Sequence, residues 1–138
     1  APETGLAAEA GLELTENGLI VVDERGEAVS PSAITALVAE RELAKEPGAT
    51  IIHNLITSRA VPELVAEHGG RAVRTRVGHS FIKAQMAESD AVFGGEHSAH
   101  YYFRDFFFAD TGMLAALHLL AALGEHRAAA AGANVSRT

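Results

Sequence analysis

The sequence predicts an α/β fold, a single domain spanning roughly residues 18–125 in which a mixed β-sheet is flanked by helices. Two observations predict this class. The chain has 138 residues, of which 48% are hydrophobic and 21% charged, as expected for one globular domain. Along it, the spacing of apolar residues changes repeatedly between the period of a strand and the period of a helix.

The first elements of the domain are predicted from turn and cap residues. Residues 19–29 are expected to form a short hairpin with a Gly-containing turn. Ser30 as N-cap and Pro31 at the first helical position begin a helix with one apolar face, which the Pro-Gly pair at 47–48 ends. Residues 51–52, both Ile, then form a buried strand.

The middle of the chain is predicted to hold a second helix and a second strand. After Ser58, apolar residues recur at helical spacing over residues 61–65, and the glycines at 69–70 stop the helix. Residues 71–77 alternate apolar or Thr side chains with arginines, which predicts a strand with one buried and one basic face. The buried face is expected to hold Val73, Thr75 and Val77.

The last third of the chain is predicted as a helix, two strands and a long helix. Residues 79–88 form the first helix, and residues 91–93 and 101–108 form the strands. Asp110 caps the final helix, and Gly124 ends it.

Three consecutive aromatic residues stand at the end of the second of these strands. We expect Phe106, Phe107 and Phe108 to be buried on both faces of the sheet. The alternative is that they form a surface for self-association.

Composition and charge exclude several classes of protein. The net charge of −7 would repel the phosphates of a nucleic acid. The absence of cysteine excludes disulfides, thiolate metal sites and a Cys nucleophile. No apolar run is long enough to span a membrane, so we expect a soluble, cytoplasmic protein with flexible ends at residues 1–17 and 126–138.

The densest cluster of reactive side chains lies between the two predicted strands, in residues 94–105. Its glycines allow a tight turn, and Glu96, Ser98 and His100 supply hydrogen-bond donors and acceptors side by side, which suits the adjacent hydroxyls of a sugar. One alternative is a surface turn whose polar groups cap strand ends. Another is a divalent metal bound by Glu96, His97 and His100, which the spacing supports only weakly.

A second cluster occupies residues 77–83, where a strand leads into a helix. Free N–H groups at a helix start attract an anion, and His79 and Lys83 add positive charge. The alternative is that Ser80 is an N-cap and Lys83 a solvated charge.

These clusters, in this order, resemble segments of the α-D-phosphohexomutases, the phosphomannomutase/phosphoglucomutase family. Residues 95–100, Gly-Glu-His-Ser-Ala-His, resemble the family's sugar-specificity loop, usually Gly-Glu-Met-Ser-Gly-His. Residues 77–83 resemble its Gly-His-Ser segment, and residues 53–59 resemble the turn that opens the third domain. The resemblance covers most of the predicted core, and its loop departs from the family pattern at His97 and Ala99.

The resemblance implies a fold and a function for the chain. It would be the third, sugar-binding domain of a four-domain enzyme that interconverts hexose 1-phosphate and 6-phosphate, with the tail of the second domain. Glu96 and Ser98 would bind the sugar's 3- and 4-hydroxyls. His100, Lys83 and the loop residues Gly95, His97 and Ala99 would lie at the same pocket, with His79 near the active centre. The partner would be mannose or glucose phosphate.

The chain also lacks features that the family's reaction requires. Nothing in these residues resembles the phosphoserine segment, and we expect this chain to hold no fourth domain. Where the family has three magnesium-binding aspartates, this chain has Glu13, Thr15 and Asn17, a poor set of ligands for Mg²⁺. We therefore expect no metal or other cofactor in this chain and no catalysis by it alone. Two alternatives are a separate phosphosugar-binding module and an interaction domain that self-associates or binds missing mutase domains.

Overall fold

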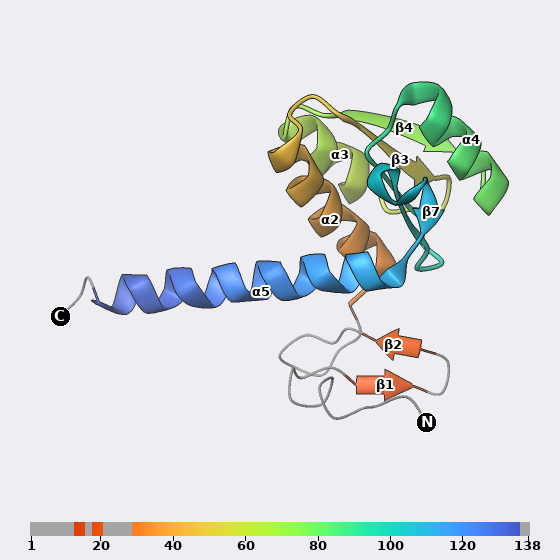
Figure 1. Ribbon diagram of the computed structural model, residues 1–138. Coiled ribbons are helices and arrows are strands. Elements are labelled where there is room, and N and C mark those ends of the chain that lie inside the picture. The colour runs from red at the N-terminus through yellow and green to blue at the C-terminus, as the bar shows by residue number, and fades with distance from the viewer. Residues whose placement is uncertain (1–12, 16–17, 21–28, 136–138) are drawn as a thin grey trace. The chain divides into compact units, whose positions relative to one another are not determined.

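The computed structural model describes residues 13–15, 18–20 and 29–135, and the chain divides into two compact units after Ser30 (Figure 1). In the first unit, β1 (Glu13–Thr15) pairs antiparallel with β2 (Gly18–Ile20). The observed hairpin therefore differs from the predicted one over residues 19–29. The strand at residues 18–20 pairs with the residues before it, whereas the prediction paired it with residues after it. Of its predicted partner, residues 28–29, only Val29 is described and it is not in a strand, and most of the predicted flexible end at 1–17 lies outside the described residues. The division after Ser30 also places this hairpin outside the unit that holds the α/β core, which was predicted to begin at residue 18.

The second unit contains a five-stranded mixed sheet, which confirms the predicted fold class. Its strand order is β4-β3-β5-β6-β7; β3 is parallel to β4 and β5, and the last three strands are antiparallel. The strands are β3 (Thr50–Asn54), β4 (Arg71–Thr75), β5 (Phe93–Gly95), β6 (Tyr101–Phe103) and β7 (Ala109–Asp110). Because β3, β4 and β5 run in the same direction, the loops that follow them lie at one edge of the sheet.

Helices cover both faces of this sheet. The neighbours of two adjacent glycines in β5 show which helix lies on which face. A Cβ built on Gly94 would contact Met86 and Ile82 of α4, whereas a Cβ built on Gly95 would meet Thr35 of α2. Successive residues of a strand face opposite sides, so α2 and α4 lie on opposite faces. The helices are α2 (Pro31–Lys45), α3 (Ala60–Glu67), α4 (His79–Ser89) and α5 (Gly112–Val135).

The predicted starts and ends of the first three helices are confirmed. Pro31 begins α2. Proline suits this position because the N–H of the first helical residue has no acceptor within the helix, and α2 ends before Pro47 and Gly48. Beyond α3, Gly69 adopts a φ of +72°, the left-handed conformation that ends many helices, and its N–H donates to the carbonyl of Ala66 (3.0 Å). The apolar residues that these helices and the sheet bury include Val38, Ile51, Ile52, Val61, Val65, Ile82, Met86 and Phe93.

The prediction for the basic strand is correct except at its end. Arg71 and Arg74 of β4 are exposed and Thr75 is buried. Val77, however, lies beyond the last residue of β4 and is half exposed, so it does not extend the buried face.

The predicted strand over 101–108 is wrong in its second half. β6 ends at Phe103, and a 3₁₀ turn (Arg104–Phe106) leads back to β7. Phe107 and Phe108 take positive φ angles of 58° and 53°, and Phe107 is 85% exposed. Of the three Phe residues, only Phe108 packs against the core, so burial of the run on both faces is also wrong.

The last helix differs from the prediction at both ends. Asp110 belongs to β7, and Thr111 accepts the hydrogen bond from the N–H of Leu114 (3.5 Å) in place of the predicted cap. The helix passes through Gly124 and reaches Val135, so residues 126–135 are helical where a flexible tail was predicted. In the described part of the chain, no helix combines the length and the apolar character that crossing a membrane requires.

Candidate functional site

The carboxylate of Glu96 joins the three loops that follow β3, β4 and β5. Its Oε1 accepts hydrogen bonds from Asn54 Nδ2 and from the N–H of Gly78, both at 3.3 Å, and its Oε2 accepts one from the Tyr102 hydroxyl at 2.9 Å. Glu96 is 1% exposed, and Thr57 in turn donates to Asn54 Oδ1 (2.6 Å). A buried carboxylate is stable only when it is hydrogen-bonded, and here it holds the strand-end loops in one arrangement.

Tyr102 connects this carboxylate to the predicted site residue His79. The Tyr102 hydroxyl has one proton, which it donates to Glu96, so its oxygen accepts from His79 Nδ1 at 2.5 Å. Nδ1 of His79 therefore carries a proton, and Nε2 is the nitrogen available to other groups. Burial and the hydrogen bond to Glu96 raise the pKa of Tyr102, so the phenol stays protonated in this role.

A second imidazole lies beside His79. The rings of His79 and His100 are 4.5 Å apart between centroids and meet edge to face. His100 Nδ1 is 2.7 Å from Asp110 Oδ2, and the other oxygen of Asp110 accepts from the N–H of Tyr101 (2.9 Å). One ligand atom from each of His79, His100 and Asp110 lies within 4.8 Å of the others.

The loop between β5 and β6 is short and closed by its own backbone. The N–H of Glu96 donates to the carbonyl of His100 (3.0 Å), and the N–H of Ala99 donates to the carbonyl of Glu96 (3.2 Å). His97 lies 3.1 Å from the hydroxyl of Ser32 on α2, while Ser98 is exposed at the tip. Glu96 and His97 thus point to different partners, and the predicted metal set of Glu96, His97 and His100 does not come together among the described residues.

The tip of this loop holds an alanine in a conformation that favours glycine. Ala99 has a φ of +65°, which costs a residue with a Cβ about 1 kcal/mol relative to glycine. Ala99→Gly is therefore expected to raise the free energy of unfolding by about 0.5–1 kcal/mol, measured by urea denaturation. Ser98→Gly, at the neighbouring exposed position, serves as the control and should not be stabilising. A destabilised Ala99→Gly variant would contradict this account of the turn.

The start of α4, where an anion site was predicted, has no side-chain cap in the structure. Gly78 is the N-cap residue, with a φ of +131°, and no side chain caps the helix. Ser80 lies inside the helix and is exposed, so its alternative role as N-cap is wrong. Lys83 is exposed on α4, and the structure gives it no hydrogen bond or ion pair within the described residues.

Sequence reasoning missed three members of the site. Tyr102 was assigned to a strand, Asn54 to the turn over residues 53–59 and Asp110 to a helix cap, yet all three contact predicted site residues. A signal was available, because a polar residue that ends a buried strand, such as Asn54, lies at the edge where ligands bind in α/β sheets.

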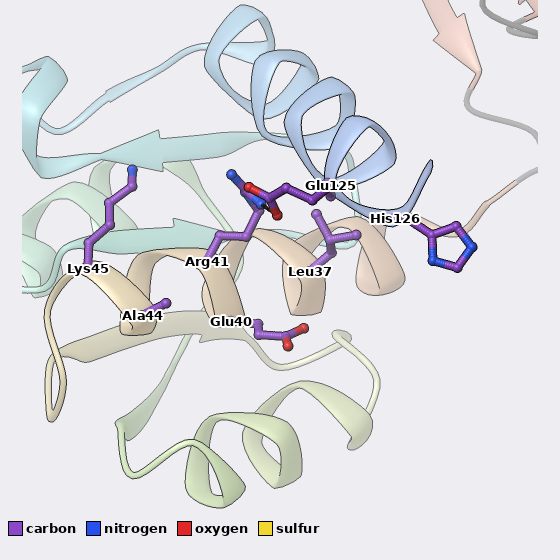
Figure 2. Close-up of a pocket in the computed structure, with 8 residues that line it drawn as sticks. Leu37, Glu40, Arg41, Ala44, Lys45, Glu125 and His126 are labelled. Carbon is purple, nitrogen blue, oxygen red and sulfur yellow. Dashed lines mark hydrogen bonds and ion pairs between the residues drawn. The ribbon is translucent and has the colours of Figure 1, made fainter. Parts of the chain in front are cut away.

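A separate cleft of about 650 Å³ lies between α2 and α5 (Figure 2). Its charged groups are largely engaged: Arg41 donates to Glu125 (2.6 Å) and to His118 (3.2 Å), and Lys45 pairs with Glu42 (2.6 Å). The cleft is lined by Leu37, Glu40, Arg41, Ala44, Lys45, Ala122, Glu125 and His126. None of the predicted site residues lines it, so the strand-end loops remain the candidate site.

Comparisons with known proteins identify the family of this chain. A family model described as phosphoglucomutase/phosphomannomutase, alpha/beta/alpha domain III, matches residues 30–134. The chain is 46% identical over 92 residues to the phosphomannomutase of Escherichia coli K12, which covers 67% of the chain and 20% of that protein. It is 39% identical over 119 residues to the phosphomannomutase of Methanocaldococcus jannaschii, covering 85% of the chain and 26% of that protein.

Solved structures give the same result. A phosphoglucomutase/phosphomannomutase family protein from Burkholderia thailandensis superposes with a TM-score of 0.66 and 33% identity, covering 74% of this chain and 22% of that one. A structure of a putative phosphomannomutase from Thermus thermophilus, with a TM-score of 0.71 and 20% identity, covers 85% of this chain and 29% of that one and supports the fold alone. The chain spans about a fifth to a quarter of the length of the relatives it matches. It belongs to the phosphoglucomutase/phosphomannomutase family and corresponds to the α/β/α domain III of that family.

Proposed function

We propose that this chain is the sugar-recognising domain of an enzyme that interconverts hexose 1-phosphate and hexose 6-phosphate. The observation that carries the proposal is the closed loop of residues 96–100, which presents Ser98 and His100 at the ends of the parallel strands. Family membership supports the substrate class, because relatives that share this domain are named phosphomannomutases.

The loop offers the mixture of groups that neighbouring sugar hydroxyls need. Ser98 is exposed and can both donate and accept, and His100 follows it two residues later in the same loop. Glu96 accepts three internal hydrogen bonds of the about four that a carboxylate can take, and it is 1% exposed, so a sugar hydroxyl would reach its remaining lone pair only after the loop shifts. In this proposal Ser98 and Glu96 bind the hydroxyl pair, and the loop residues Gly95, His97 and Ala99 shape the turn.

The phosphate of the substrate would interact with the start of α4. The first N–H groups of that helix have no side-chain cap; His79 is its first residue, and Lys83 is exposed about one turn further along. Charge-assisted hydrogen bonds from such groups are the usual means of holding a phosphate oxygen.

The experiment that tests the proposal is an NMR titration of the chain with mannose 1-phosphate and with glucose 1-phosphate. Saturable shifts are expected in the amides of residues 94–105 and 78–83, with a dissociation constant in the millimolar range, since only a few exposed hydrogen bonds contribute. Ser98→Ala should weaken binding about 3- to 10-fold, whereas His126→Ala, in the α2–α5 cleft, should not change it. Unchanged affinity in Ser98→Ala, or no shifts in either loop, would contradict the proposal.

We further infer that the chain alone does not catalyse the interconversion. Phosphoryl transfer needs a nucleophile, a metal and two phosphate sites held in one cleft, and the chain supplies one sugar-binding face of such a cleft. Turnover of mannose 1-phosphate by the purified chain with magnesium and a bisphosphate activator would overturn this inference. The residues at the expected magnesium loop, 13–18, include two that lie outside the described residues.

Self-association is a second candidate function, favoured by the exposed aromatic turn after β6. Phe107 is 85% exposed and Phe106 44% exposed, with their rings 6.0 Å apart. Such a pair gains free energy when a second surface covers it. Sedimentation should then show a mass that rises with concentration and that falls in Phe107→Ser; a strict monomer would count against this function.

A further inference from the structure

We propose that His79, His100 and Asp110 form a binding site for a divalent transition metal of the zinc class. Ligand atoms from these three side chains lie within 4.8 Å of one another. Among the side chains that the structure describes, those of residues 29–132, no other three His, Asp or Glu residues come together in this way. Two imidazoles and one carboxylate are ligands that zinc commonly takes when no thiolate is present.

Three secondary-structure elements fix the positions of the ligands. His79 is the first residue of α4, His100 directly precedes β6, and Asp110 is the last residue of β7. β6 and β7 are paired so that Tyr102 lies opposite Asp110. The N–H of Tyr101 holds one oxygen of Asp110, which directs the other oxygen to His100 (2.7 Å). The ligands are thus brought together by the sheet and not by a single loop.

The hydrogen bonds behind His79 prepare it for a metal. A histidine that binds a metal normally donates its other ring N–H to an acceptor, which fixes the orientation of the ring. In this structure His79 Nδ1 donates to the Tyr102 hydroxyl, and Tyr102 is held by the buried carboxylate of Glu96. The lone pair of His79 Nε2 is therefore free to bind an ion, on a ring 4.5 Å from that of His100.

The composition and exposure of the site determine which ion it suits. Three protein ligands leave at least one position for water, and the side chains of His100 and Asp110 are 38% and 32% exposed, so an ion can enter from solvent. Mg²⁺ prefers oxygen ligands and would gain only one carboxylate here. The site is thus distinct in chemistry from a magnesium site.

Calorimetric titration of the chain with ZnCl₂ tests this proposal, and it needs no sugar phosphate, so it does not depend on the proposed function. We expect one zinc ion per chain, release by EDTA and a melting temperature that rises with zinc concentration. Loss of a group that orients a ligand costs about 10- to 100-fold in affinity, so His79→Gln and His100→Gln should each cost more than about 100-fold. Tyr102→Phe, which removes only the acceptor behind His79, should cost about 10-fold.

Two histidines outside the cluster provide matched controls. His97 lies in the same loop but contacts Ser32, and His126 is exposed on α5. His97→Gln and His126→Gln should bind zinc as the parent chain does, and circular dichroism should show that all variants are folded. Zinc binding that survives His79→Gln and His100→Gln overturns the proposal. The absence of heat and of any melting shift at millimolar zinc overturns it as well.

Discussion

Replacing Glu96 by alanine is expected to lower the free energy of unfolding by about 3–5 kcal/mol, measured by urea denaturation. The substitution leaves Asn54 Nδ2, the N–H of Gly78 and the Tyr102 hydroxyl without their acceptor. An unsatisfied buried donor costs about 1–3 kcal/mol, and a domain of this size has only about 5–15 kcal/mol of stability. A loss below about 1 kcal/mol would show that the carboxylate does not organise the three loops.

Glu96→Gln is the matched variant, because it keeps one acceptor oxygen for Asn54 and Gly78. Its new amide donates to the Tyr102 oxygen, so the Tyr102 proton must turn to His79 Nδ1. The proton of His79 should then move to Nε2, and ¹⁵N shifts of the imidazole should report this change of tautomer. Ser98→Ala, in the same loop, should change stability by no more than about 0.5 kcal/mol. Sugar binding is therefore better tested with Ser98 variants than with Glu96 variants.

Gly95→Ala is expected to destabilise the domain by about 3 kcal/mol or more. A Cβ at this position would lie 2.9 Å from the Cβ of Thr35 and closer still to its Oγ1 and Cγ2. Thr35 is fully buried, its branched side chain has little rotamer freedom, and its hydroxyl donates to the carbonyl of Pro31 (2.9 Å). Either α2 or β5 must therefore move, and β5 leads directly into the loop that holds Glu96.

Gly124→Ala and Gly112→Ala are the controls for this substitution, since a Cβ at either position would meet nothing within 4 Å. Both glycines lie in α5, where alanine favours the helix by about 0.5–1 kcal/mol. A double variant of Gly95→Ala and Thr35→Ala should recover part of the lost stability. Equal stability of Gly95→Ala and the parent chain would mean that α2 does not pack on β5 as described.

Elements with strong local signals were predictable from the sequence. Pro31 and the Pro-Gly pair at 47–48 mark both ends of α2, and glycines mark the end of α3. The turn at Phe107 and Phe108 was not predictable, because bulky residues rarely take positive φ and nothing local signals that they do. Gly124 was predicted to end the last helix and does not. A glycine inside a helix lowers the stability of the helix without ending it.

The loops of the candidate site were predictable from the sequence, but the hydrogen bonds that connect them were not. Glu96, His79 and His100 were found from residue type and motif. Their connections run through Tyr102 and Asn54, which are 6 and 42 positions from Glu96 and whose sequence context is that of ordinary strand residues. Contacts of this kind depend on which strands become neighbours, and strand order is a property of the whole sheet.

The strand order also bears on how the domain avoids aggregation. β4 and β7 form the two edges of the sheet, and an exposed edge can pair with a strand of another molecule. β7 has only two residues, which is too short to template a further strand. β4 is longer, but Arg71 and Arg74 are exposed along it, so a second copy approaching this edge would bring like charges together. The arginines thus protect the domain from aggregation at the edge that its length would otherwise leave vulnerable.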